Sequence, residues 1–427
     1  MPAQSPKIRR RSLVGLVGAC AVVGATAAPA LIKQRPLRVG IVAPRGGITG
    51  SVGACGLRGF EWAVERLNAE NGIGGRKIEV FIEEETTPKD TIRSVNRLIH
   101  LYSVDVIQGV VSTGVSLALA PKLEAAKTLS IFWDGTTQDG VAETMPQPKY
   151  IFRSCDNECE AVMASLLAIK HYKGQFKRIA GMNASYSYGR NNWAAFQALL
   201  KKFGVDYTVV SEQWSHLGTT DLSSHVAGLK AAKPDLIFSS LLFEDLPIFM
   251  RQAHQAGLSA TTKFVLPAAG WQHSALKKEF MPEGTVYGHN TMYFDHTAAS
   301  PIQKSFVSWY WSKFQEYPHW EADRAYFALH IYKAGVEKAI RAKGGAWPSP
   351  EEIASAMEGV EIQSLGGRGG MRTDHIANQT YHQGLSTNKN RFEFSTLESV
   401  TTMYSDQLQK PSGGDFWDWL SATNFAV

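Results

Sequence analysis

The first part of the chain joins an almost entirely apolar stretch to a stretch whose apolar residues would lie on one face of a helix. Residues 37–43 form a nearly continuous apolar run, which is typical of a buried strand, and residues 44–47 break it. A helix is predicted next, because apolar residues recur at i, i+3, i+4 and i+7: Phe60, Ala63, Val64 and Leu67. Asn71-Gly72 closes this helix, and residues 78–83 then alternate apolar with acidic positions, except at Phe81. The order strand, loop, helix, turn, strand predicts a parallel crossover.

The same alternation of apolar strands and amphipathic helices continues to about residue 290. Strands are expected at residues 104–110, 129–133, 178–182, 206–210, 236–241, 264–266 and 285–287. The clearest helices between them are residues 192–202 and 222–230. Two sheets built from strand–helix–strand units are therefore expected.

The helix-closing segment carries a specific sequence pattern. The pattern consists of Asn68-Ala69, then Gly72-Ile73 after two further residues, and finally Gly75-Arg76. It resembles the opening of the type I periplasmic solute-binding proteins, the branched-chain amino acid and amide receptor family. One departure is that Asn71-Gly72 replaces the Gly-Gly of that family. Similar landmarks follow in the family's order: residues 87–89, 112–113, 133–137, 186–189 and 251–258. Their order and spacing make the resemblance specific.

The resemblance implies an α/β fold with two Rossmann-like lobes, whose parallel sheets are joined by a three-strand hinge. The chain is expected to cross between lobes near Phe152, His289 and Leu365. The expected N-lobe then comprises residues 37–153 plus 290–364, and the C-lobe residues 154–289 plus 365–427. The length agrees, because a chain of 427 residues exceeds the size at which single cores stop growing.

Residues 1–30 have the composition of an export signal. A basic start, Lys7 to Arg11, precedes an apolar run of small residues and two small-residue cleavage sites. Arg10-Arg11 also resembles a twin-arginine signal, and Cys20 offers a lipoprotein site, so three export routes stay open. Each of them places the mature protein in the periplasm.

Charge argues against a nucleic-acid partner. The whole chain has a formal net charge of +5, and removal of residues 1–30, with four basic and no acidic side chains, leaves +1. A nearly neutral chain lacks the basic surface that binds phosphate backbones.

Three cysteines follow the predicted signal. Cys155 and Cys159 are spaced to close a small disulfide loop in an oxidising compartment, or they are two buried thiols. Cys55 has no obvious partner and is either a small buried residue or a thiol that faces a cleft. Neither cysteine cluster has a second Cys or His pair at ligand spacing, so no metal site is expected.

Ligand contacts are expected at the carboxyl ends of the strands, where open parallel sheets bind ligands. In the N-lobe this selects the loops 44–55, 111–116 and 133–137, and the resemblance implies that the second and third hold a carboxylate or carbonyl oxygen. The candidate residues are Arg45, Ser112, Thr113, Trp133 and Thr136. Helix capping is the alternative role for each hydroxyl.

In the C-lobe the matching loops are residues 183–188, 239–244 and 268–271. They offer aromatic walls and polar groups: Asn183, Tyr186, Tyr188, Ser239, Phe243 and Trp271. Core packing is the alternative for each aromatic residue. Residues 268–270 lack the acidic residue with which amino-acid receptors of this family hold an ammonium group, which argues against a standard α-amino acid unless Glu244 or Asp245 replaces it.

The sequence therefore favours a receptor over an enzyme. It has no nucleophile elbow, zinc-protease motif, phosphate loop or dinucleotide fingerprint, and no cofactor is expected. The resemblance implies a monomeric receptor of an ABC importer that captures a carboxylate, with or without an aromatic ring, or an amide or amino acid. Its partner would be a permease in the inner membrane. The alternative is a sensory subunit that passes its closed state to a signalling partner.

Overall fold

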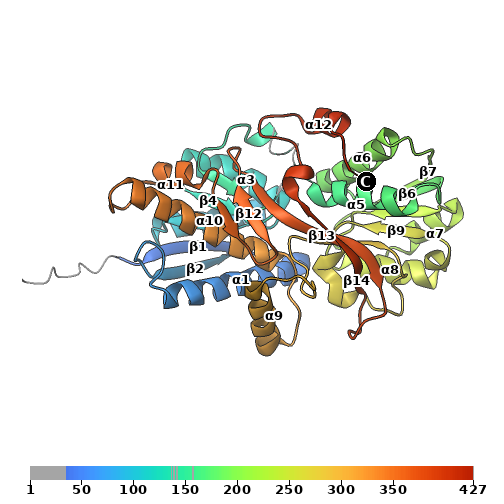
Figure 1. Cartoon of the computed structure of the whole chain (residues 1–427), viewed down its shortest axis with the longest axis horizontal. Helices are drawn as coiled ribbons and strands as arrows, with labels where there is room; N and C mark the ends of the chain where they lie inside the picture. The colour runs from blue at the N-terminus through green and yellow to red at the C-terminus, as the bar shows by residue number, and fades with distance from the viewer. Residues whose placement is uncertain (1–34, 136, 138–139, 141–142, 156–157, 427) are drawn as a thin grey trace, which may run out of the picture. The chain divides into compact units, whose positions relative to one another are not determined.

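The computed structural model describes residues 35–135, 137, 140, 143–155 and 158–426. The predicted export signal and Thr136 lie outside the described residues. Everything below concerns the part of the chain that begins at Pro36. It forms an α/β fold of two lobes, each built around one sheet (Figure 1).

The N-lobe contains a five-stranded parallel sheet with the strand order β2-β1-β3-β4-β5. The strands are β1 (Leu37–Ala43), β2 (Ile78–Glu84), β3 (Val106–Gly109), β4 (Ser130–Phe132) and β5 (Ile151–Arg153). Because side chains alternate along a strand, Val39 and Ile41 of β1 pack on one face, whereas Val42 packs on the other. Both faces are therefore apolar, which explains the hydrophobic run in β1 that only Arg38 interrupts.

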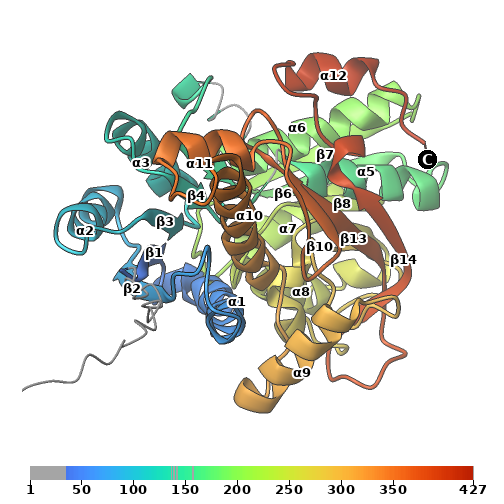
Figure 2. The ribbon, with the colours of Figure 1, turned by 60° about the vertical axis from the view of Figure 1, so that its left-hand side comes forward.

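Helices cover both faces of this sheet. Two helices, α2 (Pro88–His100) and α3 (Thr113–Ala125), pack on one face; α1 (Gly50–Ala69) and α10 (Glu321–Ala342) pack on the other (Figure 2). The helices α9 (Pro301–Phe314) and α11 (Pro350–Met357) pack on α1 and α10. A capping box between Ser349 and Glu352 begins α11.

The C-lobe contains a nine-stranded mixed sheet. Its parallel part has the order β10-β9-β8-β6-β7, with bounds β6 (Arg178–Ala184), β7 (Thr208–Ser215), β8 (Leu236–Ser239), β9 (Lys263–Leu266) and β10 (Val286–Asn290). Its antiparallel part adds β11 (Glu361–Gln363), β12 (Arg368–Met371), β13 (Ala377–Thr387) and β14 (Thr396–Tyr404). The antiparallel strands extend the parallel sheet that the sequence pattern predicts.

Helices also cover both faces of the parallel part. They are α5 (Cys159–Tyr172) and α6 (Ser187–Lys202) on one face, and α7 (Ser223–Ala232) and α8 (Asp245–Gln255) on the other. The C-terminal aromatic residues form α12 (Phe416–Ala422), which packs on α6 with Phe416 fully buried.

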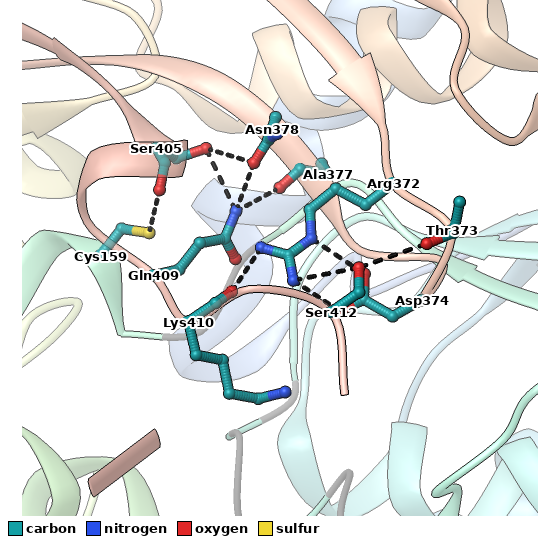
Figure 3. Close-up of polar contacts among 10 residues, drawn as sticks. All are labelled: Cys159, Arg372, Thr373, Asp374, Ala377, Asn378, Ser405, Gln409, Lys410 and Ser412. Atoms are coloured by element: carbon teal, nitrogen blue, oxygen red, sulfur yellow. Dashed lines mark hydrogen bonds and ion pairs between the residues drawn. The ribbon is translucent and has the colours of Figure 1, made fainter. Parts of the chain in front are cut away.

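Polar contacts fix the segment that leads to α12. The Nε2 of Gln409 donates to the carbonyl O of Ala377 at 3.0 Å and to Oδ1 of Asn378 at 2.7 Å (Figure 3). Arg372 donates to the carbonyl O of Lys410 at 2.7 Å and pairs with Asp374. The C-terminal segment is thus bound to the start of β13.

The expected strands agree with the structure apart from their ends. Residues 37–43 are β1 without change, whereas the strand expected at 206–210 begins later and extends to Ser215. The lobe boundaries expected from the sequence, and with them the three hinge crossings, stay a proposal. Residues 361–363, which were assigned to the N-lobe, pair with β12 of the larger sheet.

The three cysteines are buried thiols in the structure. The disulfide expected between Cys155 and Cys159 is not formed there, and the Sγ of Cys159 lies 4.0 Å from the carbonyl O of Ser405 instead. Cys55 is the small buried residue, and burial raises the pKa of its thiol to about 11.

The α1–α10 contact makes a testable prediction. A Cβ on Gly59 would lie 2.5 Å from the carbonyl O of Ala322 and 2.7 Å from its Cα. Backbone atoms cannot move aside easily, so Gly59→Ala should lower the free energy of unfolding by about 1–3 kcal/mol in urea denaturation. Gly50→Ala in the same helix is the control, because its Cβ would meet no atom closer than 3.5 Å. Equal stability of the two variants would contradict this packing.

Candidate functional site

A cavity of about 190 Å³ lies between the two lobes, at the carboxyl ends of the parallel strands. The N-lobe contributes Thr49, residues 111–114, residues 134–135, Trp320 and Arg324. The C-lobe and the connecting segment contribute Cys155, Glu158, Glu160, Tyr186, Tyr188, Leu217, residues 242–243, Trp271 and Asn290. Six of the predicted site residues line this cavity: Ser112, Thr113, Tyr186, Tyr188, Phe243 and Trp271.

The start of α3 forms one polar wall. Ser112 occupies the N-cap position, but its hydroxyl makes no capping hydrogen bond. Thr113 and Gly114 follow in the first turn of α3, and the backbone N–H groups of a first turn have no hydrogen-bond acceptor within their own helix. Both Ser112 and Thr113 thus keep groups that can bind a solute oxygen.

Glu85 supports this wall from behind. Its carboxylate accepts the N–H groups of Val111 at 2.8 Å and Ser112 at 2.7 Å. These two donors are consequently not open to a solute. Burial raises the pKa of the Glu85 carboxyl to about 7, against the lowering effect of the two hydrogen bonds.

An ion pair forms the next part of the N-lobe wall. Arg324 of α10 pairs with Asp134, and Asp134 also accepts the N–H of Gly135 at 2.7 Å. The Arg324 side chain is only 4% exposed. The pair therefore places a buried positive and a negative group at the cavity.

Trp133 lies beneath the wall instead of lining the cavity. It is fully buried and packs 6.1 Å from the Phe60 ring, and a Cβ on Gly56 would lie 2.9 Å from the indole. Core packing is its role in the structure. Arg45 is exposed and does not line the cavity either.

Aromatic rings from both lobes meet across the cavity. Trp271 stacks on Phe243 within the C-lobe at 5.0 Å between ring centroids, and on Trp320 of the N-lobe at 4.8 Å. The indole nitrogens of Trp271 and Trp320 are buried and have no hydrogen-bond acceptor among the described residues. Both Trp residues line the cavity, so their N–H groups are candidate donors to a solute. Tyr186 and Tyr188, from the same lobe as Trp271, stack on each other at 6.0 Å between ring centroids.

The lobes also touch at residues that do not line the cavity. The Nε2 of Gln272 donates to Oγ of Ser51 at 3.4 Å, from the C-lobe to the N-lobe. A Cβ on Gly218 would lie 3.3 Å from Ile48, which belongs to the other lobe. The two lobes are consequently in contact beyond the cavity as well.

Two acidic residues of the cavity were missed in the sequence analysis. Glu158 and Glu160 flank Cys159 at the start of α5, and both are buried. The Tyr188 hydroxyl donates to Glu160, and Asn191 donates to Glu158 at 3.0 Å. The acidic residues at 156, 158 and 160 are a visible signal in the sequence, but the strand-end rule does not select this segment.

The predicted polar groups of the C-lobe have other partners. Asn183 accepts the N–H of Ser240 at 3.1 Å and its hydroxyl at 2.8 Å, and Ser239 accepts the N–H of Leu241 at 3.4 Å. Both residues are buried behind the cavity wall, where they hold the loop after β8.

Neither acidic residue proposed to hold an ammonium group reaches the cavity. Asp245 accepts the N–H of Gly218 at about 3.0 Å, and burial raises the pKa of its carboxyl to about 6. Glu244 is exposed and does not line the cavity.

The described residues contain neither a metal centre nor a membrane-spanning helix. No group of three His, Cys, Asp or Glu side chains there is placed to hold a metal ion. No helix there has the length and apolar composition to cross a membrane.

Comparison with known proteins agrees with this architecture. A "Leu/Ile/Val-binding protein homolog 3" of Brucella melitensis is 27% identical over 311 residues, which cover 71% of this chain and 79% of that protein. "Leu/Ile/Val-binding protein BraC3" of Rhizobium johnstonii is 25% identical over 82% of this chain and 90% of its own length.

Solved structures show the same fold at lower identity. A solute-binding protein of an ABC transporter from Rhodopseudomonas palustris BisB5, solved with 3,4-dihydroxybenzoic acid, has a TM-score of 0.73 at 23% identity. The match covers 86% of this chain and 97% of that one. The leucine-binding protein LivK of Thermotoga maritima has a TM-score of 0.69 at 18% identity, over 85% of this chain and 98% of its own.

The relatives named here are binding proteins of transporters and not enzymes. A family model described as "Periplasmic binding protein" matches residues 36–384, which is most of the chain. The chain therefore belongs to the periplasmic binding protein family.

Proposed function

We propose that this protein is the receptor of an ABC importer and captures one small organic solute in the cavity between its lobes. The observation that carries the proposal is the cavity itself, because residues of both lobes line it at the ends of their parallel strands. A solute there contacts both lobes at once and stabilises the closed conformation relative to an open one. A permease then distinguishes the loaded receptor from the empty one by its shape.

The size and walls of the cavity limit the solute. A cavity of about 150 Å³ is large enough for benzene, so 190 Å³ holds a single ring or a short branched chain with small polar groups. The stacked Phe243, Trp271 and Trp320 suit a planar or apolar part. Structural neighbours with this fold bind 4-hydroxybenzoate or benzoate, which are of this size.

Donor groups of the walls suit a carboxylate or carbonyl oxygen. Ser112, Thr113 and the first turn of α3 line the cavity from one lobe, and they offer hydroxyl and N–H groups to such an oxygen. The indole N–H groups of Trp271 and Trp320 add two buried donors. The proposed solute is thus a carboxylate, an amide or an amino acid.

Export, the monomeric state, the permease partner and the hinge are proposed from the resemblance to the family. Residues 1–30 would direct export to the periplasm, and the mature monomer would meet its permease at the inner membrane. Hinge motion would occur at the crossings near Phe152, His289 and Leu365. No observation favours the sensory alternative.

A thermal-shift screen tests the proposal. Purified residues 31–427 should be stabilised by a member of a panel of amino acids, amides, and aliphatic and aromatic acids and amines. A solute at a hundredfold excess over its Kd stabilises by about 2.7 kcal/mol, which is readily measured. Trp271→Ala should abolish the shift, whereas Trp311→Ala should not, because Trp311 is 40% exposed on α9, away from the cavity. An unchanged shift in Trp271→Ala would contradict the location of the site.

Glu85 gives a prediction on pH. Its pKa is raised from the ordinary value of 4.5 to about 7, so the folded protein binds this proton at pH values where the unfolded chain has released it. The free energy of unfolding should therefore fall as the pH rises through this window, by about 1.4 kcal/mol per pH unit from this group.

Urea denaturation of Glu85→Gln at several pH values checks the sign of this pH dependence. The difference in stability between the native protein and this variant should depend on pH between about 5 and 7. Glu84→Gln, an exposed neighbour in β2, should follow the native protein at every pH. Parallel pH curves for the native protein and Glu85→Gln would show that Glu85 is ionised throughout.

A further inference from the structure

We propose that acid opens this receptor: protonation of His273, His289 and His319, which are buried together where the lobes meet, separates the lobes and releases the solute. The inference rests on the proposed function and adds a regulation of the same cavity. The three imidazoles are at most 6% exposed, and none of them lines the cavity. The response to acid therefore needs no contact between a histidine and the solute.

The three histidines come from both lobes. His319 immediately precedes Trp320, the N-cap of α10, which covers the N-lobe sheet. His273 lies in the 3-10 helix η3 (Ala269–Ala275) and His289 lies in β10, both in the C-lobe. The centroids of the His273 and His289 rings are 5.5 Å apart, and His319 is close enough for its charge to lower the pKa of His289.

A hydrogen bond between the lobes lies at the same place. Gln272, next to His273, donates from Nε2 to Oγ of Ser51 at 3.4 Å. The His319 ring also forms a hydrogen bond with the backbone of Ser51. One turn further along α1, the Sγ of Cys55 lies 3.7 Å from the carbonyl O of His319. The histidine cluster is thus part of the lobe boundary itself.

The hydrogen bonds of the cluster require neutral imidazoles. Nδ1 of His319 accepts the N–H of Glu321 at 3.3 Å, and protonation would turn this acceptor into a donor. Nδ1 of His273 donates to the carbonyl O of Gly270 at 2.9 Å, so it carries the proton of the neutral ring. Nε2 of His273 and both ring nitrogens of His289 are buried without a hydrogen-bond partner among the described residues. A further proton would consequently place a buried charge where the described residues offer no acceptor.

Burial and neighbouring charges act on the cluster in the same direction. Burial lowers the pKa of His319 to about 3, and repulsion from His273 contributes to this shift. The guanidiniums of Arg324 and Arg58 lower the pKa of His319 as well. Burial lowers the pKa of His273 to about 4 and that of His289 well below the ordinary 6.5. All three rings are therefore neutral near pH 7 while the lobes are in contact.

The titratable groups that surround the cluster in the described part of the chain are also uncharged near pH 7. Burial raises the pKa of the neighbouring phenols and thiol and lowers the pKa of the neighbouring imidazole: Tyr287, Tyr293, Tyr310, Cys55 and His382. The Glu321 carboxyl is neutral too, because burial and the charge of Asp134 raise its pKa well above 4.5.

Two carboxylates of neighbouring segments have partners of their own. Asp295 pairs with Arg391 at 3.0 Å, and Asp323 accepts the N–H of Gly366 at 3.1 Å. The hydrogen bonds described for the three imidazoles include neither carboxylate. A proton on the cluster would therefore keep its repulsive charge.

Separation of the lobes removes these costs. Water then reaches the cluster, and His319 moves away from His273 and His289, so each pKa returns towards the ordinary 6.5. A pKa that is lower in the lobe contact stabilises the contact above pH 6.5, and this stabilisation is lost as the pH falls. At pH 5, a change in the pKa of His273 from about 4 to about 6.5 on opening would favour the open form about thirtyfold.

Spin-label distances between the lobes test the inference without a solute. Labels at Arg45→Cys and Thr220→Cys, one exposed position on each lobe, report the short and long distance components. From pH 7.5 to pH 5, the ratio of the short to the long component should fall about thirtyfold or more. The far-UV circular dichroism spectrum should stay unchanged over the same range, because the lobes separate without unfolding.

Two variants assign the effect to the histidines. His273→Asn keeps a donor for the carbonyl O of Gly270, and His319→Asn keeps an acceptor for the N–H of Glu321, but neither amide takes up a proton. Each variant should show a fall at least about threefold smaller than the native protein. His100→Asn, at an exposed position of α2, should respond as the native protein does.

The native pH series tests the inference even if neither variant folds. An unchanged ratio at pH 5, separation of the lobes only together with unfolding, or no short component at pH 7.5 would overturn it. The same fall in the native protein and in both variants would overturn the assignment to histidines. Each of these results leaves the receptor proposal intact, because the thermal-shift screen tests that proposal at neutral pH. Stabilisation by no solute would count against the receptor proposal, whereas the distances are measured without solute.

Discussion

The aromatic stack of Phe243, Trp271 and Trp320 is the contact on which the closed structure depends. It continues across the boundary between the lobes, with Trp320 at the N-cap of α10, Trp271 in a short 3-10 helix of the C-lobe and Phe243 on a C-lobe loop. Such ring pairs contribute about 0.5–1.5 kcal/mol beyond the burial of their area. Opening the lobes must separate Trp271 from Trp320 and expose both to water. Under the proposed function, a solute that packs against the same rings would add to this contact only in the closed state and would thereby favour closure.

The walls around the stack are positioned by buried polar groups that do not touch the solute. Glu85 holds the two N–H groups before α3, and Arg324 holds Asp134. Each contact replaces water with a fixed partner, so the loops keep their shape when the cavity is empty. The start of α5 has the corresponding support from Gln383 and Ser405. The site is therefore preorganised on both sides, and the relative position of the lobes is the main variable.

Much of this arrangement could be predicted from the sequence. Apolar runs located the parallel strands, and the rule that ligands bind at strand ends selected Ser112, Tyr188 and Trp271, which do line the cavity. The same rule could not tell which way a side chain points. It therefore also selected Trp133 and Asn183, which face the interior.

Other parts of the site had no local signal. Trp320 and Arg324 reach the cavity from a helix that follows the N-lobe sheet by well over a hundred residues, and only the tertiary fold brings them there. Glu160 lies in the first turn of α5, a position to which no periodicity points. The antiparallel strands β11–β14 alternate too irregularly to stand out, because bulges interrupt the pairing of β13 with its neighbours.

The central claim is that a solute closes the lobes over this cavity. Spin labels on cysteines introduced at Arg45 and Thr220, exposed positions on the two sides of the mouth, would measure the distance between the lobes directly. Without solute the distance distribution should include a long component. Saturation with a bound solute should shift it to the short component, which corresponds to the contact of Ile48 with the loop at Gly218. A distribution that is the same with and without bound solute would contradict closure.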